Sequence, residues 1–336
     1  MAKSKLSLRQ QNRIRAKQKK ATEAVASDQV IETLLNSGQL GPEQKGMVVT
    51  RYSNQADVAS VANPNLRRRC YFRAHLESPV SGDRVIWRDG EPYGVIYSVL
   101  PRTSLLERPD SRGIVRPVAA NINHIVIVIA PEPKAHAALI DRYLVACEYH
   151  QIEPTLVVNK ADMPGAMIEP LTQLANQYLK LGYRVVRTSA KTGIGVDTLG
   201  QLSADRVSIF VGQSGVGKSS LINALSPSAQ VKTGELSHAK AKGRHTTTTT
   251  DLYTLANDGR IIDSPGVREF GLLHLNEADL ANGFIEFRDF LGQCRFRNCS
   301  HRDDPGCALE QACQNGLISD ARLKSFRDIR ESLHLT

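Results

Sequence analysis

Between residues 46 and 108 the chain consists of short apolar runs that glycine, proline, asparagine and aspartate interrupt. About five such runs within about 60 residues are typical of short strands joined by tight turns. A closed barrel of the OB type is the natural candidate, because closure removes the exposed sheet edges of so small a domain. We therefore predict an OB-like β-barrel at residues 41–112.

Strand-like and helix-like patterns alternate between residues 113 and 273. Such alternation predicts an α/β domain with a mostly parallel sheet and helices on both of its faces. The strands are expected at 125–130, 155–160, 184–189, 207–212, 252–255 and 260–263. The helices are expected near 135–150, 169–181 and 218–225.

The last part of the chain, residues 274–336, is predicted to be a mostly helical domain. It ends in a basic amphipathic helix that places apolar side chains near one side. These side chains are Leu317, Ile318, Leu323, Phe326, Ile329 and Leu333. Residues 1–40 form a basic N-terminal arm and a polar, partly helical lead-in. A multidomain protein of this kind agrees with the length of 336 residues, which is more than one ordinary domain holds.

Basic residues indicate a polyanionic partner. Residues 1–20 carry eight basic side chains and no acidic one, so that most of the net charge of +9 lies in this arm. Such an arm attracts nucleic acid by counterion release, although a solvated tail without a partner has the same composition. On the barrel, a stacking and phosphate-binding face for RNA and a mixture of core aromatics and solvated arginines are equally open readings. The residues concerned are Tyr52, Tyr71, Tyr97, Arg67, Arg68 and Arg69.

The composition, 41% hydrophobic and 23% charged, is that of a soluble globular protein. No apolar run approaches the roughly 20 residues that a bilayer span requires, and the basic N-terminus lacks the apolar segment of a secretory signal. Six cysteines over this length do not indicate a disulfide framework. We expect a cytoplasmic monomer without a membrane partner.

A phosphate-binding loop is predicted after the strand that ends near residue 211, where a helix begins. Its spacing is that of a P-loop, whose glycines let backbone N–H groups turn toward phosphates while the helix dipole adds to the attraction. Lys218 is expected at the β- and γ-phosphates and the Ser219 hydroxyl on Mg²⁺. The residues of this loop are Gly212, Gln213, Ser214, Gly215, Val216, Gly217, Lys218, Ser219 and Ser220.

Asn159, Lys160 and Asp162 stand at the end of an apolar strand and favour GTP over ATP. The Asp162 carboxylate can accept hydrogen bonds from the ring N–H and the amino group of guanine, a pair that adenine does not offer. Lys160 is expected to lay its stem over the base, and Asn159 to tie this loop to the phosphate loop. An ATPase or a small-molecule kinase is the alternative if Asp162 takes no part.

Residues on the Mg²⁺ side are expected between the P-loop and an Asp-x-x-Gly motif that begins at Asp263. Asp263 can hold Mg²⁺ through water, and the Gly266 N–H can sense the γ-phosphate. Thr247 is the favoured threonine to close on Mg²⁺, with Thr246 as the alternative. GTP or GDP and Mg²⁺ are thus the expected ligands.

The order of these motifs is unusual. The guanine motif and a third loop (Ser189, Ala190 and Lys191, whose Ala190 N–H can contact the guanine oxygen) precede the P-loop. In Ras-like GTPases the P-loop comes first. Joining residue ~270 to ~120 and opening the chain near ~205 restores that order, and domains tolerate such circular permutation because their termini lie at the surface. We hypothesise that residues 264–280 then carry the nucleotide state to the C-terminal segment.

Cys294, Cys299, His301 and Cys307 lie within 14 residues of one another. Three thiolates and one imidazole match a closed, structural Zn²⁺ site with no open position for catalysis. Cys313 is the main competing ligand. Reduced cytosolic thiols without a metal are the alternative.

With a basic arm, an OB-like barrel, a permuted GTPase domain and a terminal Cys/His segment, the chain resembles the RsgA (YjeQ) family along essentially its whole length. The Cys-x₄-Cys-x-His-x₅-Cys spacing matches the pattern of that family. The resemblance implies binding to the small ribosomal subunit and its rRNA, late maturation of that subunit, and GTP hydrolysis that the ribosome stimulates. Other assembly factors are further candidate partners.

The position that holds a water-orienting glutamine in Ras-like enzymes is Val267, which cannot orient water, so the intrinsic turnover is expected to be slow. His245 is the best internal substitute, as is suspected for related permuted GTPases, and an RNA-facing or solvated histidine is the alternative. We therefore expect Lys218, Thr247 and His245 to act in hydrolysis. The alternative function is a GTP-gated RNA-binding checkpoint whose turnover is incidental.

Overall fold

The computed structural model describes residues 28–63, 66–109, 114–229, 231, 250–263, 275–302 and 304–334. The chain separates into two compact units, and each is described by itself. The first comprises Met1–Thr103, Ala119–Asn121 and Thr249–Leu252, and the second comprises the rest. In this division, residues 104–109 and the C-terminal helices belong to the same unit as the α/β domain.

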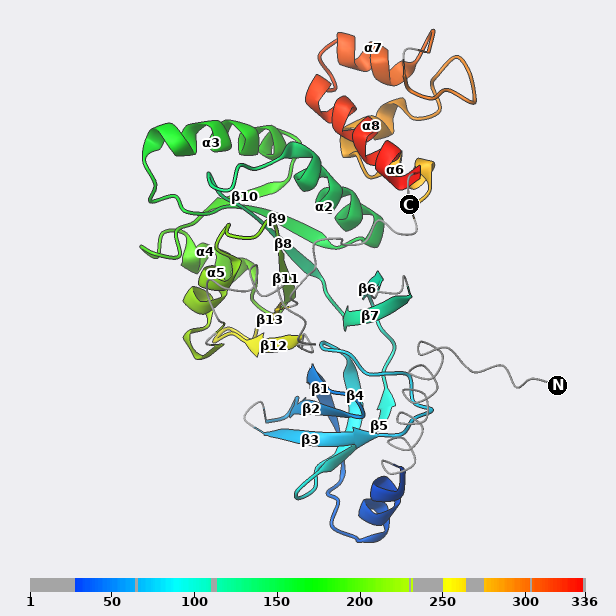
Figure 1. The fold of residues 1–336 in the computed structure, drawn as a ribbon, viewed down its shortest axis with the longest axis vertical. Helices are drawn as coiled ribbons and strands as arrows, with labels where there is room; N and C mark the ends of the chain where they lie inside the picture. The colour runs from blue at the N-terminus through cyan, green and yellow to red at the C-terminus, as the bar shows by residue number, and fades with distance from the viewer. Residues whose placement is uncertain are drawn as a thin grey trace, which may run out of the picture. The chain divides into compact units, whose positions relative to one another are not determined.

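The first unit contains a closed five-stranded barrel (Figure 1). Strand β1 pairs with β2, β2 with β3, β3 with β5, β5 with β4, and β4 with β1, which closes the circle. The prediction of an OB-like barrel is confirmed. The strands are β1 (Glu43–Arg51), β2 (Gln55–Ser60), β3 (Arg67–Phe72), β4 (Arg84–Arg88) and β5 (Gly94–Val99).

The barrel interior is filled by side chains that alternate with outward-facing ones along each strand, as expected for a small barrel. On β3, Cys70 and Phe72 point inward while Tyr71 between them is half-buried on the outside. The interior cluster also contains Trp87, the one tryptophan of the sequence, which is fully buried. Tryptophan fluorescence therefore reports on the interior of the barrel.

The second unit is built on a parallel sheet in the order β10-β9-β8-β11-β13. Its strands are β8 (His124–Ile129), β9 (Glu153–Val158), β10 (Arg184–Arg187), β11 (Val207–Val211) and β13 (Arg260–Asp263), and β12 (Asp251–Thr254) precedes β13. The predicted strands are present within one or two residues. The strand that precedes the P-loop, β11, is central although it comes late in the chain, as permutation requires.

Helices cover both faces of this sheet (Figure 1). On one face, Val126 and Val128 of β8 pack with residues of α4 (Val196–Leu202) and α5 (Lys218–Leu225). On the other face lie α2 (Ala137–His150) and α3 (Gly165–Lys180), which contact β8, β9 and β10. A short hairpin of β6 (Leu105–Pro109) and β7 (Val115–Ala120) precedes β8. The predicted fold class, an α/β domain with helices on both faces, is confirmed.

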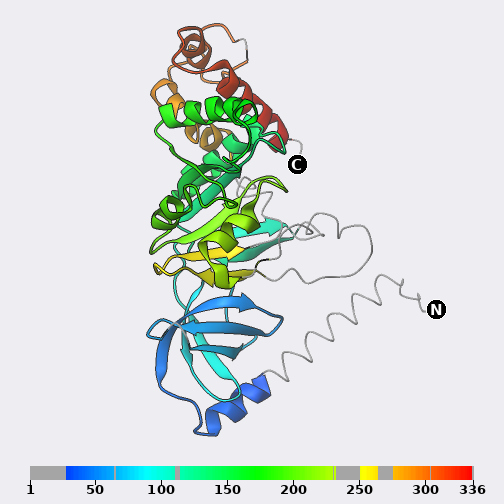
Figure 2. The same cartoon turned by 90° about the vertical axis from the view of Figure 1, so that its left-hand side faces the viewer.

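The C-terminal part of the second unit is helical. It contains α6 (Glu277–Asn282), the 3₁₀ segment η3 (Ile285–Phe290), α7 (Ala308–Gln314) and α8 (Asp320–His334). Helix α8, red in Figure 1 and Figure 2, packs against α2. Its apolar side buries Leu323, Phe326 and Ile329, as predicted, but Leu317 is 61% exposed. That assignment was wrong because Leu317 lies in the turn before α8, where helical spacing does not apply.

A buried charge cluster joins α8 to α2. The Arg322 side chain, 6% exposed, lies 2.5 Å from Asp141 of α2 and 2.6 Å from Glu286 of η3. The guanidinium also lies over the ring of Phe284, 4.4 Å from its centroid. Tyr178 of α3 donates a hydrogen bond to Asp141. Burial raises the pKa of the Asp141 carboxyl group.

Among the helices of the described residues, none combines the length and the apolar character of a bilayer-spanning helix.

Replacement of Arg322 by alanine is expected to lower the free energy of unfolding of the second unit by about 3–5 kcal/mol, because it leaves buried carboxylates uncompensated. Arg288→Ala is the matched control. The side chains of Arg288 and its partner Glu148 are 42% and 22% exposed, respectively, so the loss of this ion pair costs at most about 1 kcal/mol. Urea denaturation followed by the helix signal in circular dichroism measures both. Equal costs for the two variants would contradict the assignment of a buried cluster.

Candidate functional site: a nucleotide site at the sheet edge and a Cys/His cluster

The parallel strands of the second unit end at one edge of the sheet, and most of the described predicted nucleotide residues follow these ends. Asn159 follows β9, Ser189 lies two residues beyond β10, and Gly212 follows β11. Because β9, β8 and β11 are neighbours in register, loops far apart in the sequence meet here. In open α/β sheets, ligands bind at the carboxyl ends of the strands.

The loop after β11 has positive φ at its three glycines, and at two of them a side chain would also clash with a neighbour. Gly212 has φ +136°, and a Cβ there would lie 2.2 Å from the carbonyl oxygen of Val128. Gly217 has φ +93°, and a Cβ there would lie 2.4 Å from the Nδ2 of Asn159. The loop runs directly into α5, whose first residue is Lys218. The Lys218 ammonium donates to the carbonyl oxygens of Gly212 and Gln213, at 2.9 and 2.7 Å, so its charge lies at the centre of the loop.

The buried side chain of Asn159 connects three loops. Its Nδ2 donates to the carbonyl oxygen of Val216 in the P-loop at 2.8 Å. Its Oδ1 accepts from the Thr188 hydroxyl at 3.1 Å. The guanine motif, the third loop and the phosphate loop therefore form one site.

Asp162, which is exposed, lies beside the third loop. The Ser189 hydroxyl donates to its Oδ1 at 2.6 Å. This hydrogen bond is the main reason that the pKa of Asp162 lies below its ordinary value, and Lys191 and Lys160 lower it further. The carboxylate is therefore ionised at neutral pH and can accept hydrogen bonds from a base. Ala190 is half-buried against the core beside the sheet.

The structure adds a segment that the sequence did not single out. Residues 131–134 follow β8 at the same sheet edge, between the guanine motif and the P-loop. The carbonyl oxygen of Glu132 accepts from the Lys160 ammonium at 2.7 Å, and Pro133 lies next to Gly215, 3.6 Å from a Cβ built there. The signal was the prolines at 131 and 133 directly after an apolar strand, at the edge where the other loops meet.

On the Mg²⁺ side, Ser219 and Ser220 lie in the first turn of α5. Asp263 is the last residue of β13, the strand next to β11. The predicted residues His245, Thr246, Thr247 and Gly266 lie outside the described residues, as does Val267.

The four predicted metal ligands come together in the C-terminal part. The Nδ1 of His301 lies 3.6 Å from the Sγ of Cys294, 3.6 Å from that of Cys299 and 3.4 Å from that of Cys307. In a tetrahedral zinc site, bond lengths of about 2.0 Å to nitrogen and 2.3 Å to sulfur separate N and S by about 3.5 Å. The donor set and its spacing fit Zn²⁺. The competitor Cys313 instead donates to Asp320 at 3.1 Å.

Two arginines of α8 hold the loop that carries His301. Arg327 donates to the carbonyl oxygen of His301 at 3.0 and 2.9 Å, and Arg330 donates to that of Ser300. Asp304 accepts from the N–H and the hydroxyl of Ser300 at 2.7 and 2.6 Å. Such outer contacts orient metal ligands.

Burial favours the uncharged forms of the thiol and imidazole groups in the cluster. It raises the pKa of the Cys299 thiol to about 12 and lowers the pKa of His301. A metal ion requires thiolates and a neutral imidazole, so that its binding displaces the thiol protons and becomes stronger as the pH rises.

The predicted RNA face of the barrel is only partly basic. The Arg69 guanidinium lies 3.9 Å from the centroid of the Tyr52 ring, but it also pairs with Asp57. Tyr71 packs edge-on against Tyr93. The rings of Tyr52 and Tyr71 are thus half-buried, and the charge of Arg69 is compensated by Asp57.

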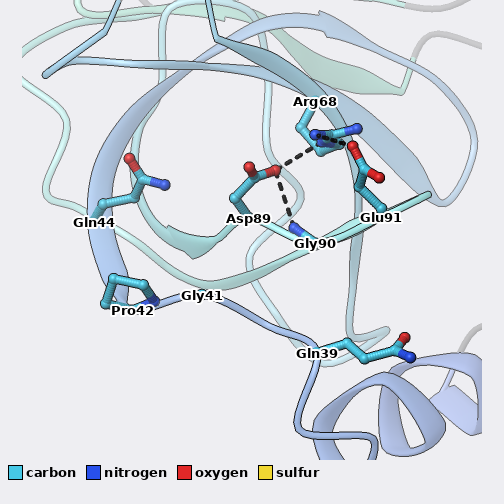
Figure 3. A pocket seen from close by; sticks show the side chains of 8 residues that line it. All are labelled: Gln39, Gly41, Pro42, Gln44, Arg68, Asp89, Gly90 and Glu91. Carbon is cyan, nitrogen blue, oxygen red and sulfur yellow. Dashed lines mark hydrogen bonds and ion pairs between the residues drawn. The ribbon is translucent and has the colours of Figure 1, made fainter.

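Arg68 does not belong to that face. It lines a cavity of about 600 Å³ in the barrel unit, where it pairs with Asp89 at 2.7 Å and Glu91 at 3.4 Å (Figure 3). Gln39, Gln44 and Gly90 also line this cavity. The Arg68 guanidinium is compensated by the carboxylates of Asp89 and Glu91, so the cavity has no excess positive charge to attract RNA phosphates.

A phosphate loop on the central strand, a guanine-type motif beside it and the late position of that strand in the chain define a circularly permuted P-loop GTPase. Comparison with known proteins agrees: a family model described as RsgA GTPase matches residues 99–273. The chain belongs to the RsgA GTPase family.

Relatives match along the whole chain. A protein of Hahella chejuensis is 48% identical over 99% of this chain and 97% of its own length. One of Pseudomonas aeruginosa (strain LESB58) is 47% identical over 99% of this chain and 98% of its own length. Both are named small ribosomal subunit biogenesis GTPase RsgA.

Two solved structures are similar. YjeQ from Thermotoga maritima is 31% identical with a TM-score of 0.71 and covers 87% of this chain and 99% of its own. YloQ, described as a circularly permuted GTPase, is 26% identical with a TM-score of 0.67, and the match covers 87% of this chain and 96% of YloQ.

Replacement of Gly217 by alanine is expected to weaken GTP binding at least about 10-fold, because positive φ costs a side chain 1–2 kcal/mol or more and the methyl group displaces Asn159. Isothermal titration calorimetry with GDP and a non-hydrolysable GTP analogue measures the change. Gly165→Ala is the control, since a Cβ at Gly165 meets nothing within 4 Å. Wild-type affinity in Gly217→Ala would show that the contact with Asn159 does not support the site.

Proposed function

We propose that this chain binds GTP between Asp162 and Lys218 and hydrolyses it during biogenesis of the small ribosomal subunit. The observation that carries the proposal is the hydrogen bond from Asn159 to the carbonyl oxygen of Val216, because it holds a base-reading loop against a phosphate-binding loop. Family membership and the names of the relatives support the biological role.

Each part of the nucleotide has a group to receive it. The P-loop amides and Lys218 bind the phosphates, and Asp162 accepts hydrogen bonds from guanine. Lys160, held by Glu132, covers the base, and the Ala190 N–H contacts the guanine oxygen. Ser219 ligates Mg²⁺ directly, and Asp263 does so through water. The remaining contacts come from Ser189, Lys191, Gly212, Gln213, Ser214, Gly215, Val216, Gly217 and Ser220.

For hydrolysis we propose that Thr247 completes the Mg²⁺ site, that Gly266 senses the γ-phosphate and that His245 orients the attacking water. These roles rest on the sequence motifs alone. Valine at position 267 provides no group that orients water, so the intrinsic turnover is slow and a partner completes the site. The transmission of the nucleotide state through residues 264–280 likewise stays a prediction.

Zn²⁺ is the proposed occupant of the Cys294, Cys299, His301 and Cys307 cluster. Four protein ligands leave no open position for substrate, so the ion has a structural role. It would tie the loop before α7 to the loop that Arg327 and Arg330 of α8 hold.

The proposed partner is the small ribosomal subunit with its rRNA, and other assembly factors are secondary candidates. A cytoplasmic monomer agrees with this role. The alternative is a GTP-gated RNA-binding checkpoint with incidental turnover, which the basic arm of residues 1–20 favours because its eight cations provide affinity without chemistry.

Asp162→Asn is expected to weaken GTP binding at least about 100-fold, because it removes charge-assisted hydrogen bonds worth about 1.5–3 kcal/mol each. The same variant should bind xanthosine triphosphate better than the wild type does, since the new amide can donate to the 2-oxo group of xanthine. Competition against a fluorescent GDP measures both affinities. Asp197→Asn, which removes an exposed charge from α4, is the control. An unchanged ratio of GTP to ATP affinity in Asp162→Asn would exclude base reading by Asp162.

Single-turnover hydrolysis of GTP with and without isolated small subunits tests the function. We expect the small subunits to raise the rate at least about 10-fold and His245→Ala to lower the stimulated rate by about 10²–10³-fold while nucleotide affinity is retained, because the loss of a group that orients water acts on the chemical step. A wild-type rate that small subunits leave unchanged would favour the checkpoint alternative. Stimulation that persists in His245→Ala would reject only the role of that histidine.

A further inference from the structure

An exposed aromatic ring stands in the loop between two of the predicted metal ligands. This loop, Cys294–Cys299, carries Phe296 between Arg295 and Arg297. All three side chains are exposed, and Phe296 has 46% of its surface in solvent. A partner outside the chain can therefore reach the ring and the two arginines beside it at the same time.

The loop is held at several points. The N–H of Arg295 donates to the carbonyl oxygen of Gly306 at 3.0 Å, and that of Cys299 donates to the carbonyl oxygen of Phe296 at 3.2 Å. The N–H of Ala308 donates to the Sγ of Cys294 at 3.4 Å. Because both ends of the loop also belong to the Cys/His cluster, the ring is presented on a constrained support. Little conformational entropy is then lost when a ligand stacks on it.

The charges around the ring differ from those on the neighbouring helix. Three arginines of α8 form ion pairs within the second unit: Arg322 with Asp141, Arg327 with Glu310 and Arg330 with Glu277. Among the described residues, by contrast, no acidic side chain forms an ion pair with Arg295 or Arg297. These three arginines of the basic last helix therefore have compensated charges, whereas the cations beside Phe296 do not.

The Arg295 guanidinium lies over the Phe296 ring, 5.4 Å from its centroid. This cation–π contact keeps one arginine at the ring, within reach of a phosphate that a stacked nucleotide would bring. The ring supplies a π-face that any base can use. An apolar protein partner fits less well, because the residues on both sides of Phe296 in the chain are charged and its apolar area is that of one side chain.

We propose that Phe296 stacks on an unpaired base of RNA, with Arg295 and Arg297 at the adjacent phosphates. The proposal rests on the proposed function, since the RNA is that of the small ribosomal subunit. It assigns to the Cys294–Cys299 loop a contact with single-stranded rather than duplex RNA, because a paired base offers no free face to an aromatic side chain.

Phe296→Trp in the full-length protein tests the contact directly. The native Trp87 is fully buried in the barrel, so the wild type gives the background signal. We expect oligoadenylate, and small subunits with a GTP analogue, to quench the emission of the new tryptophan, whereas duplex RNA of equal length leaves it unchanged. Oligoadenylate affinity should fall about 10-fold in Phe296→Ala and be retained in Phe296→Tyr.

Leu317→Ala is the matched control, because Leu317 is an exposed apolar residue of the same C-terminal part, 61% in solvent. It should bind RNA as the wild type does. The double variant Arg295→Gln/Arg297→Gln should lower the slope of log affinity against log salt by about 1.4, the value for two phosphates of a single strand. Zinc content and basal GTP hydrolysis equal to the wild type show that each variant is folded.

Equal oligoadenylate affinity of Phe296→Ala and the wild type would overturn the proposal. So would quenching by small subunits but not by oligoadenylate or protein-free rRNA, because the partner of the ring would then be a protein. Failure of the proposed function is a separate result: small subunits would not stimulate wild-type GTP hydrolysis, whatever the fluorescence shows.

Discussion

The buried side chain of Asn159 holds together the part of the molecule that defines its chemistry. One amide donates to the P-loop at Val216 and accepts from Thr188 beyond β10, so that it joins loops from three strands. Gly217 leaves room for this amide, because any side chain at that position would collide with the Nδ2 of Asn159. In the proposed function, this contact couples base recognition to phosphate binding, because it holds the loop that carries Asp162 against the P-loop. The permuted chain order does not disturb it, since the contact depends on the sheet order and not on where the chain begins.

Charge compensation determines the surfaces of the molecule as much as charge itself. The sequence contains a basic last helix, yet its arginines at 322, 327 and 330 are used inside the second unit. Arg322 ties α8 to the α/β domain, and the other two hold the loop that carries His301. Arg68 and Arg69 of the barrel are compensated in the same way. A count of basic residues therefore overestimates the positive charge that RNA can reach. The exposed ring of Phe296 is the better candidate for an RNA contact, because among the described residues no carboxylate pairs with Arg295 or Arg297 beside it.

Much of the fold followed from patterns that act over short distances. The helix predicted at 218–225 has those bounds, and β8, β9 and β11 lie within two residues of the predicted strands, because a continuous apolar run or a P-loop start is visible locally. The composition of the barrel unit depends on packing that short patterns do not show: residues 119–121 and 250–252 join the first unit through contacts distant in sequence. Leu317 was misassigned because helical spacing was extended past the start of α8.

The sequence by itself determined which residues are candidates for the two sites, because a P-loop, a guanine motif and a Cys/His spacing each place their groups within a short stretch of the chain. It also determined the permutation, which is a statement about order alone. Only the tertiary structure decided that Asn159 bridges the loops, that Glu132 and Pro133 border the proposed nucleotide site, and that Cys313 pairs with Asp320 instead of joining the Cys/His cluster. It also decided which arginines form ion pairs. The physical reason is that these outcomes depend on which partners the folded chain brings within a few ångströms, and neighbours in space are distant in sequence.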